Sequence, residues 1–294
     1  MDIDNLSDAE RGKLIKMTDT FNFFEEVYRY DKKSEENYLV DGLIEPASIV
    51  LIYGAPKTGK TLVSIDLATS LSSADKWLGR KIPKPANVIY LAYEDPKSII
   101  RRMQCAFKFK FDQENYINNR IMVSEQPPDI LDQNFENGLQ FTLRWILYDD
   151  DTDVKLQNVL IVDTLAMAMG GRGDENSSSF MGLFIDTFRR IRNLGITVIV
   201  VHHSGKDPKK GSRGHTSLVA AADSIFSVQK KGASNSLTLT RELYRNGPAG
   251  EKFTFEIETG VLNDESVSYD PGYIVPYLSH IEGFSDAKKE NALI

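Results

Sequence analysis

The chain has 294 residues, 41% hydrophobic and 26% charged, which is ordinary for a globular protein of one large domain or two small ones. No apolar run approaches the roughly 20 residues of a membrane span, and the acidic start "MDIDNLSDAE" is unlike a signal peptide. The net charge of −7 argues against a globally basic nucleic-acid binder, although a local basic patch would still act over about 10 Å. Cys105 is the only cysteine, which excludes an intramolecular disulfide, and we expect a cytosolic protein.

Residues 1–37 are mixed and charged, and we treat them as an N-terminal segment that could supply a short amphipathic helix between subunits, with Phe21, Phe24 and Val27 on one side. A domain is expected over residues 38–269, followed by a weakly patterned tail over 270–294. The acidic run from Asp149 to Asp153 is interpreted as a solvated helix end rather than a metal site.

Strands and helices alternate from Ser48 onward. The predicted strands are "SIVLIYG", "NVIYLAYED", "NVLIVDT" and "ITVIVVHHS", and the predicted helices are "TLVSIDLATSLSSA", "PKSIIRRMQCAFKF", "NFENGLQFTLRWILYDD" and "FMGLFIDTFRRIRNLG". This alternation predicts an α/β fold with a mostly parallel, doubly wound, twisted sheet flanked by helices. After about residue 222, "DSIFSVQK" and "SLTLTREL" predict an antiparallel hairpin around "KGASN", and "EKFTFEIE" predicts a further strand.

The motif "GAPKTGKT" fits the phosphate-binding pattern G-x-x-x-x-G-K-[ST], and it lies after a predicted strand and before a predicted helix. Its glycines let backbone N–H groups turn toward phosphates, and the helix N-terminus adds a partial positive charge. We expect it to bind ATP, with Lys60 reaching the β- and γ-phosphates and the Thr61 hydroxyl holding Mg²⁺. The predicted nucleotide-binding residues are Gly54, Ala55, Pro56, Lys57, Thr58, Gly59, Lys60 and Thr61.

The strand "NVLIVDT" delivers Asp163, the predicted second Mg²⁺ residue, but Thr164 follows where many ATPases have a catalytic glutamate. Hydrolysis still needs a group that orients and polarises water. The strand after the P-loop helix ends in Glu94 and Asp95, and the carboxyl ends of parallel strands face one crevice. We therefore predict that Glu94 is this group and that Asp95 caps the helix beginning at Pro96, although a capping role for both remains open.

The order of a P-loop, a strand ending in E-D-P, a strand ending in D-T and a strand ending in H-H before a basic loop resembles the RecA-like ATPase core. The likeness is strongest to the RepA-like plasmid helicases and their phage relatives, and weaker to DnaB-like replicative helicases. It covers roughly residues 38–260. The resemblance implies a ring, usually a hexamer, that hydrolyses ATP between subunits and moves along single-stranded DNA, with a replication or loading partner. It also implies the bacterial cytoplasm, or the host cytoplasm for a phage- or plasmid-encoded protein.

The resemblance assigns roles to further residues. His203 matches a residue that senses the γ-phosphate, with His202 beside it, although two structural histidines at a sheet edge remain an alternative. Arg245, in "YRNGPAG", matches an arginine that stabilises charge on the γ-phosphate bound by the neighbouring subunit. DnaB-like enzymes carry a lysine two residues earlier, where this chain has Leu243, and Arg213 is a second candidate for the arginine role.

Two loops, "MGGRGDENSSS" and "SGKDPKKGSRGH", are expected at the carboxyl edge of the sheet. The second is basic and glycine-rich, which suits the backbone of single-stranded DNA, and it lacks aromatic residues for base stacking. An ordinary solvated loop remains an alternative. The predicted DNA-binding residues are Lys206, Lys209, Lys210 and Arg213.

Two rival functions follow from the same motifs. One is a RecA-like signalling or assembly ATPase that has no nucleic-acid substrate. The other is a small-molecule P-loop kinase, which needs an arginine-rich lid and an acceptor pocket that we do not recognise in the sequence.

Overall fold

The computed structural model describes residues 38–111, 120–147, 156–173, 177–203, 216–230, 232, 234–262 and 273–280. All of them belong to the compact unit Tyr38–Ile294. The helix expected within residues 1–37 and the acidic run at residues 149–153 lie outside the described residues.

A nine-stranded sheet forms the centre of the described part, in the order β3-β2-β4-β5-β1-β6-β7-β8-β9. Strands β3 through β6 in that order pair in parallel, and β7, β8 and β9 are added antiparallel. This confirms the predicted mostly parallel core with C-terminal antiparallel strands. The strands are β1 (Ile49–Gly54), β2 (Ala86–Ala92), β3 (Ile121–Ser124), β4 (Gln157–Asp163), β5 (Ile196–His203), β6 (Ser224–Lys230), β7 (Ser236–Tyr244), β8 (Lys252–Leu262) and β9 (Tyr273–His280).

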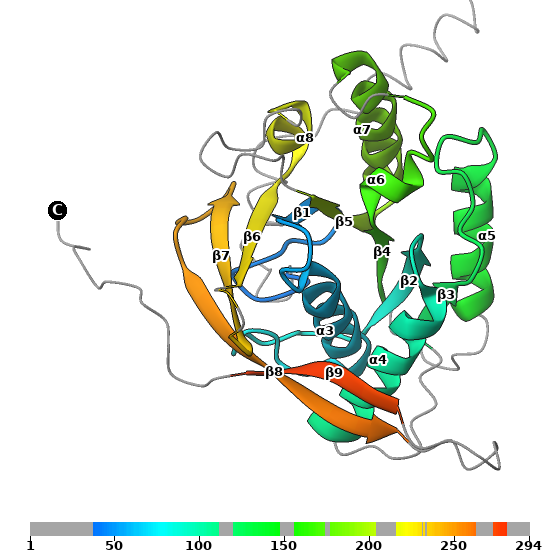
Figure 1. The fold of residues 1–294 in the computed structure, drawn as a ribbon. Coiled ribbons are helices and arrows are strands. Elements are labelled where there is room, and N and C mark those ends of the chain that lie inside the picture. The colour runs from blue at the N-terminus through cyan, green and yellow to red at the C-terminus, as the bar shows by residue number, and fades with distance from the viewer. Residues whose placement is uncertain are drawn as a thin grey trace, which may run out of the picture. The chain divides into compact units, whose positions relative to one another are not determined.

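Helices cover both faces of the parallel part of the sheet (Figure 1). On one face lie α3 (Lys60–Ser73) and α4 (Pro96–Lys110), around which β8 and β9 curl. On the other face lie α5 (Phe135–Leu147), α6 (Leu165–Ala168), α7 (Ser178–Asn193) and α8 (Thr216–Ala221). None of the helices among the described residues is long and apolar enough to cross a membrane.

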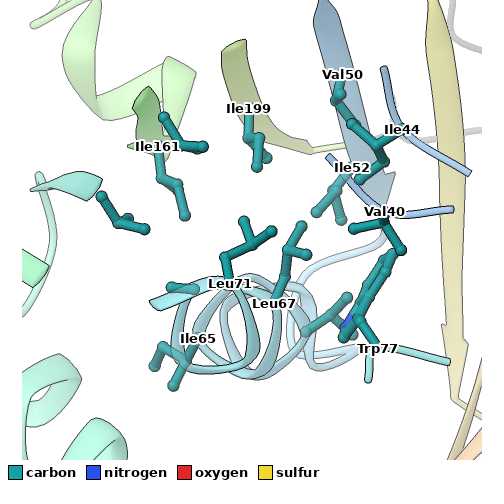
Figure 2. Close-up of a cluster of buried hydrophobic side chains, with 14 of the residues drawn as sticks. Val40, Ile44, Val50, Ile52, Ile65, Leu67, Leu71, Trp77, Ile161 and Ile199 are labelled. Carbon is teal, nitrogen blue, oxygen red and sulfur yellow. The ribbon is translucent and has the colours of Figure 1, made fainter. Parts of the chain in front are cut away.

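Strand alternation divides the core into two clusters, because successive side chains of a strand point to opposite faces. In β1, Val50 and Ile52 pack toward α3, whereas Ile49 and Leu51 pack toward the other helices. Figure 2 shows the first cluster, in which side chains of α3 meet those of β1, β4 and β5. Since helix α3 is buried on almost every side, its N-terminus is held firmly at the carboxyl edge of the sheet.

The buried charge within α3 is paired. The Asp66 carboxylate, 2% exposed, accepts hydrogen bonds from the Lys110 ammonium at 2.7 Å and from the Trp77 indole N–H at 3.0 Å. A buried charge is tolerated when it is paired and hydrogen-bonded. The pair joins α3 to the end of α4 and so fixes the helix that carries the P-loop.

Two strands were not predicted from the sequence. Strand β3 has only four residues, all half-buried, and β9 lies in the segment that the sequence assigned to a weakly patterned tail. That expectation was wrong for residues 273–280, which pair with β8 along their whole length. Strand β9 contains Pro276, which sheet edges accept because one side of an edge strand has no ladder partner.

Candidate nucleotide-binding site

The P-loop is built on a close approach between two strands. Gly54 ends β1, and a Cβ atom added there would lie 2.4 Å from the carbonyl oxygen of Val228 on β6. Gly59 has a φ of 96°, in the left-handed region that glycine adopts most easily, and it precedes α3 without giving a side-chain cap. The first N–H groups of α3 are therefore available to an anion in the loop.

Lys60 is buried within this loop. The residue is 5% exposed. Its ammonium group donates a hydrogen bond to the carbonyl oxygen of Ala55 at 2.9 Å. Burial lowers the pKa of Lys60 to about 8, against the opposing effects of Asp163 and Glu94. A phosphate in the loop would add negative charge beside the amine and favour its protonated form.

Asp163 ends β4 directly beside the start of α3. The residue is 2% exposed, and its Oδ1 accepts a hydrogen bond from the Thr61 hydroxyl at 3.3 Å. Burial raises the pKa of the Asp163 carboxyl, and its hydroxyl donors oppose that rise. A carboxylate and a hydroxyl are oxygen ligands of the kind that Mg²⁺ takes. The two residues predicted to hold the metal ion thus lie together and fit it.

Glu94 lies beside the residue that replaces the usual catalytic glutamate. Strand β2 pairs with β4, and Ala92 is opposite Asp163 in the register. The residues that follow β2 therefore lie beside the residues that follow β4. The Thr164 hydroxyl donates to Oε1 of Glu94 at 3.2 Å. The Glu94 side chain is 52% exposed, as a group that meets water should be. Asp95 caps α4, because its Oδ1 accepts from the Ser98 N–H at 3.1 Å.

The two histidines at the end of β5 face opposite sides of the sheet. His203 pairs with Gly54 in the β1–β5 register and shares the face of Ile199, toward α3. Its Nε2 lies 3.9 Å from Oε1 of Glu94. His202 is 1% exposed and lies on the other face. Of the two, His203 therefore lies on the side where the P-loop and Glu94 meet.

A family model described as an AAA domain matches residues 29–209, which is more than half of the chain. The chain belongs to the AAA domain family. It is also 27% identical over 251 residues to the DNA repair and recombination protein RadB of Methanobrevibacter smithii, a match that covers 81% of this chain and 97% of RadB.

Two solved structures resemble this AAA domain protein. One is the structure of an ATPase domain, which matches with a TM-score of 0.57 and 15% identity, over 80% of this chain and 95% of that one. The other is a KaiC-like protein of Pyrococcus horikoshii, which matches with a TM-score of 0.51 and 15% identity, over 83% of this chain and 95% of that one. The fold is that of a RecA-like P-loop ATPase, as the sequence predicted.

Arg245 lies at the edge of the sheet opposite to the P-loop. Strand β7 is antiparallel to β6, and its last residue, Tyr244, pairs with the first residue of β6. The Arg245 guanidinium Nε lies 3.2 Å from Oδ1 of Asp223, whose Oδ2 accepts from the Ile49 N–H at 2.9 Å. The whole length of β1, about 20 Å at 3.3 Å per residue, separates this arginine from the P-loop of its own subunit.

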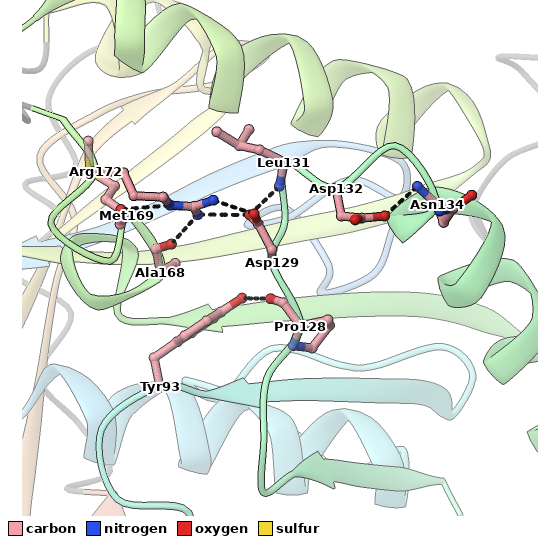
Figure 3. A network of polar contacts seen from close by, with 9 residues as sticks. All are labelled: Tyr93, Pro128, Asp129, Leu131, Asp132, Asn134, Ala168, Met169 and Arg172. Carbon is pink, nitrogen blue, oxygen red and sulfur yellow. Dashed lines mark hydrogen bonds and ion pairs between the residues drawn. The ribbon is translucent and has the colours of Figure 1, made fainter.

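Of the two predicted DNA loops, the first is described at residues 169–173 and 177–179, and the second, residues 204–215, lies outside the described residues. The first holds a contact that the sequence did not predict, because the Arg172 guanidinium pairs with both carboxylate oxygens of Asp129 (Figure 3). Next to Asp129, the Tyr93 hydroxyl donates to the Pro128 carbonyl at 2.7 Å. Beside these contacts an apolar hollow of about 550 Å³ lies between β2, β3 and α5, on the face away from the P-loop helix. The predicted DNA-binding residues lie outside the described residues: Lys206, Lys209, Lys210 and Arg213.

We predict that Gly54→Ala weakens nucleotide binding strongly and lowers the free energy of unfolding by about 1–3 kcal/mol, because the new Cβ must displace the backbone of β6. Gly182→Ala is the matched control, since a Cβ there meets open space within helix α7. It should leave binding unchanged and slightly stabilise the helix. Fluorescent-nucleotide titration and urea unfolding measure both quantities, and equal behaviour of the two variants would contradict the packing argument.

We predict that Glu94→Gln lowers ATP turnover by about 10²–10⁴-fold while nucleotide affinity stays near that of the wild type, because the amide cannot accept a proton from water. Asp95→Asn is the control, because asparagine still caps the helix. Steady-state phosphate release measures turnover. Near-normal turnover by Glu94→Gln would place the catalytic carboxylate elsewhere.

Proposed function

We propose that the protein hydrolyses ATP between adjacent subunits of a ring, for which six subunits are expected, and uses the reaction to move along or unwind single-stranded DNA. The observation that carries this proposal is the division of the charged groups between the two edges of the sheet. Lys60, Asp163 and Glu94 meet at the carboxyl edge, whereas Arg245 lies at the amino edge. An arginine that acts on the γ-phosphate from this position must act on the nucleotide of another subunit.

In the proposed reaction, Glu94 orients the attacking water and accepts its proton, and the Thr164 hydroxyl holds the carboxylate in place. Lys60 neutralises charge on the β- and γ-phosphates, and His203 donates a hydrogen bond to the γ-phosphate. Thr61 and Asp163 would hold Mg²⁺, which when bound neutralises charge on the phosphates and orients them. Arg245 of the neighbour stabilises the charge that develops as the γ-phosphoryl group leaves.

Two observations support DNA as the substrate. The relative RadB is a DNA repair and recombination protein. The basic loop that contains Lys206 begins directly after His203, so DNA bound there would lie next to the residue proposed to contact the γ-phosphate. Leu243, at the position of a lysine in the resembling helicases, favours the alternative of a RecA-like signalling or assembly ATPase that has no nucleic-acid substrate.

We predict that changing Lys206, Lys209 and Lys210 together to alanine weakens single-stranded DNA binding and reduces the slope of log affinity against log salt by about 0.7 for each lost phosphate contact. Basal ATPase should persist. Fluorescence anisotropy at several salt concentrations measures affinity and slope.

The matched control removes the same charge elsewhere, by changing the exposed residues Lys76, Lys81 and Lys252 to alanine. It should leave the slope unchanged. If both triple variants retain the affinity and slope of the wild type, the loop is not in the DNA path and the signalling or assembly function is favoured. Equal losses in both would indicate an effect of net charge alone.

We predict that Arg245→Ala lowers ATP turnover by about 10³–10⁵-fold with little change in nucleotide affinity, because the arginine contributes only at the neighbour's γ-phosphate. Arg80→Ala, which also removes an arginine from an ion pair with a carboxylate, should remain active. Mixing Arg245→Ala with Lys60→Ala protein should restore part of the activity, since some interfaces then hold an intact Lys60 and an intact Arg245.

Single-chain tandem dimers with a defined order of the two substitutions sharpen this test. One order pairs the intact residues at the covalent interface, and the other order pairs them at the interface between dimers, so a ring of either dimer should keep part of the activity if Arg245 acts in trans. If both orders are silent although rings form, either Arg245 acts in its own subunit or turnover requires every interface to be intact. Full activity of Arg245→Ala would move the role to Arg213.

A further inference from the structure

A buried tyrosine lies next to the predicted metal ligand. Strand β2 is buried along its whole length, and Tyr90 is 0% exposed. In the β2–β4 register Tyr90 is opposite Ile161, and Ala92 is opposite Asp163. Tyr90 and Asp163 are therefore diagonal neighbours on one face of the sheet, a separation that an aromatic side chain can span. The small side chain of Ala92 leaves the tyrosine hydroxyl room to reach the carboxylate.

The hydroxyl of Tyr90 donates to Oδ2 of Asp163 at 2.5 Å. Because an ionised carboxylate can only accept and a tyrosine hydroxyl has a single proton, this bond uses the only donor that Tyr90 has. The Ser64 hydroxyl lies 2.8 Å from the Tyr90 oxygen and 3.4 Å from Oδ2. Ser64 thus holds the tyrosine from the first turns of α3, and the three side chains form one closed network.

In this network the two oxygens of the Asp163 carboxylate have different hydrogen-bond partners. Oδ2 faces Tyr90 and Ser64, whereas Oδ1 faces the hydroxyl of Thr61. Thr61 is the other residue expected at the Mg²⁺ ion. We propose that Tyr90 is a positioning residue for the metal: its hydroxyl fixes the rotation of the Asp163 carboxylate, so that Oδ1 is the oxygen presented to Mg²⁺ or to a water bound to it.

The proposal rests on the Mg²⁺–nucleotide part of the proposed function and is independent of DNA and of ring formation. Residues that orient a metal ligand typically change metal affinity by about 10–100-fold when they are removed. Tyr90→Phe deletes the hydroxyl and keeps the ring that packs in the core. A loss of packing would weaken nucleotide binding whether or not the metal is present, whereas a loss of positioning would weaken only the contribution of the metal.

The experiment measures the affinity of the full chain for a fluorescent mant-ADP, once with saturating Mg²⁺ and once with EDTA. For the wild type the ratio of the two affinities gives the contribution of the metal. Tyr90→Phe should reduce this ratio by about 10-fold or more while the affinity in EDTA stays the same. Ser64→Ala, which removes the side chain that holds the tyrosine oxygen, should reduce the ratio by a smaller factor.

Tyr277→Phe is the matched control, because it removes a hydroxyl that donates to the carboxylate of Glu258 at 2.6 Å, far along the sheet on β9. Its ratio should equal that of the wild type. The proposal is wrong if Tyr90→Phe keeps the wild-type ratio, or loses affinity equally with and without Mg²⁺. If Tyr90→Phe does not fold, an unchanged ratio in Ser64→Ala overturns the proposal. A wild-type protein that fails to bind mant-ADP would instead contradict the proposed function itself.

Discussion

The burial of the Asp163 carboxylate is the constraint on which the site depends. Placing an ionised group inside a protein is costly unless hydrogen-bond donors surround it. Here the donors come from two directions: Thr61 and Ser64 lie on the first turns of α3, and Tyr90 lies on β2. Satisfying one carboxylate therefore fixes the start of α3 against two strands. Since the P-loop leads directly into α3, the position of the phosphate cradle follows from the same contacts.

The sequence allowed most of the parallel core to be predicted, because strands buried on both faces appear as apolar runs and end at glycine or polar residues. The β6–β7 hairpin was predicted because two strand-like segments flank the short turn-forming stretch "KGASN". The edge strands gave no comparable pattern. Strand β3 is four residues long and half-buried, and β9 contains a proline, so their place in the sheet depends on distant pairing partners.

The candidate site likewise has features that the sequence predicted and features that it did not. The proximity of the P-loop, Asp163 and Glu94 could be predicted because each lies at the carboxyl end of a parallel strand, and these ends face one crevice; their roles stay predictions. The hydrogen bond from Thr164 to Glu94 depends on the register of β2 against β4, which no local pattern encodes. Tyr90 resembles any aromatic residue of a buried strand, so its hydroxyl gave no sign of its partner. The pairing of Arg245 with Asp223 joins the residue that follows β7 to the residue that precedes β6, and it was also not predicted.

Strand β6 has a consequence for how neighbouring sites would influence each other. Near its carboxyl end, the Val228 carbonyl packs against Gly54 at the base of the phosphate cradle. Just before its amino end, Asp223 holds Arg245. One hydrogen-bonded strand thus connects the nucleotide of a subunit with the arginine that the proposed ring offers to the next nucleotide. A shift of the cradle on binding or releasing phosphate would reach that arginine through a stiff element rather than a loop. In the proposed ring, sites linked in this way would hydrolyse ATP cooperatively. The expected result is a sigmoidal dependence of ATP turnover on ATP concentration.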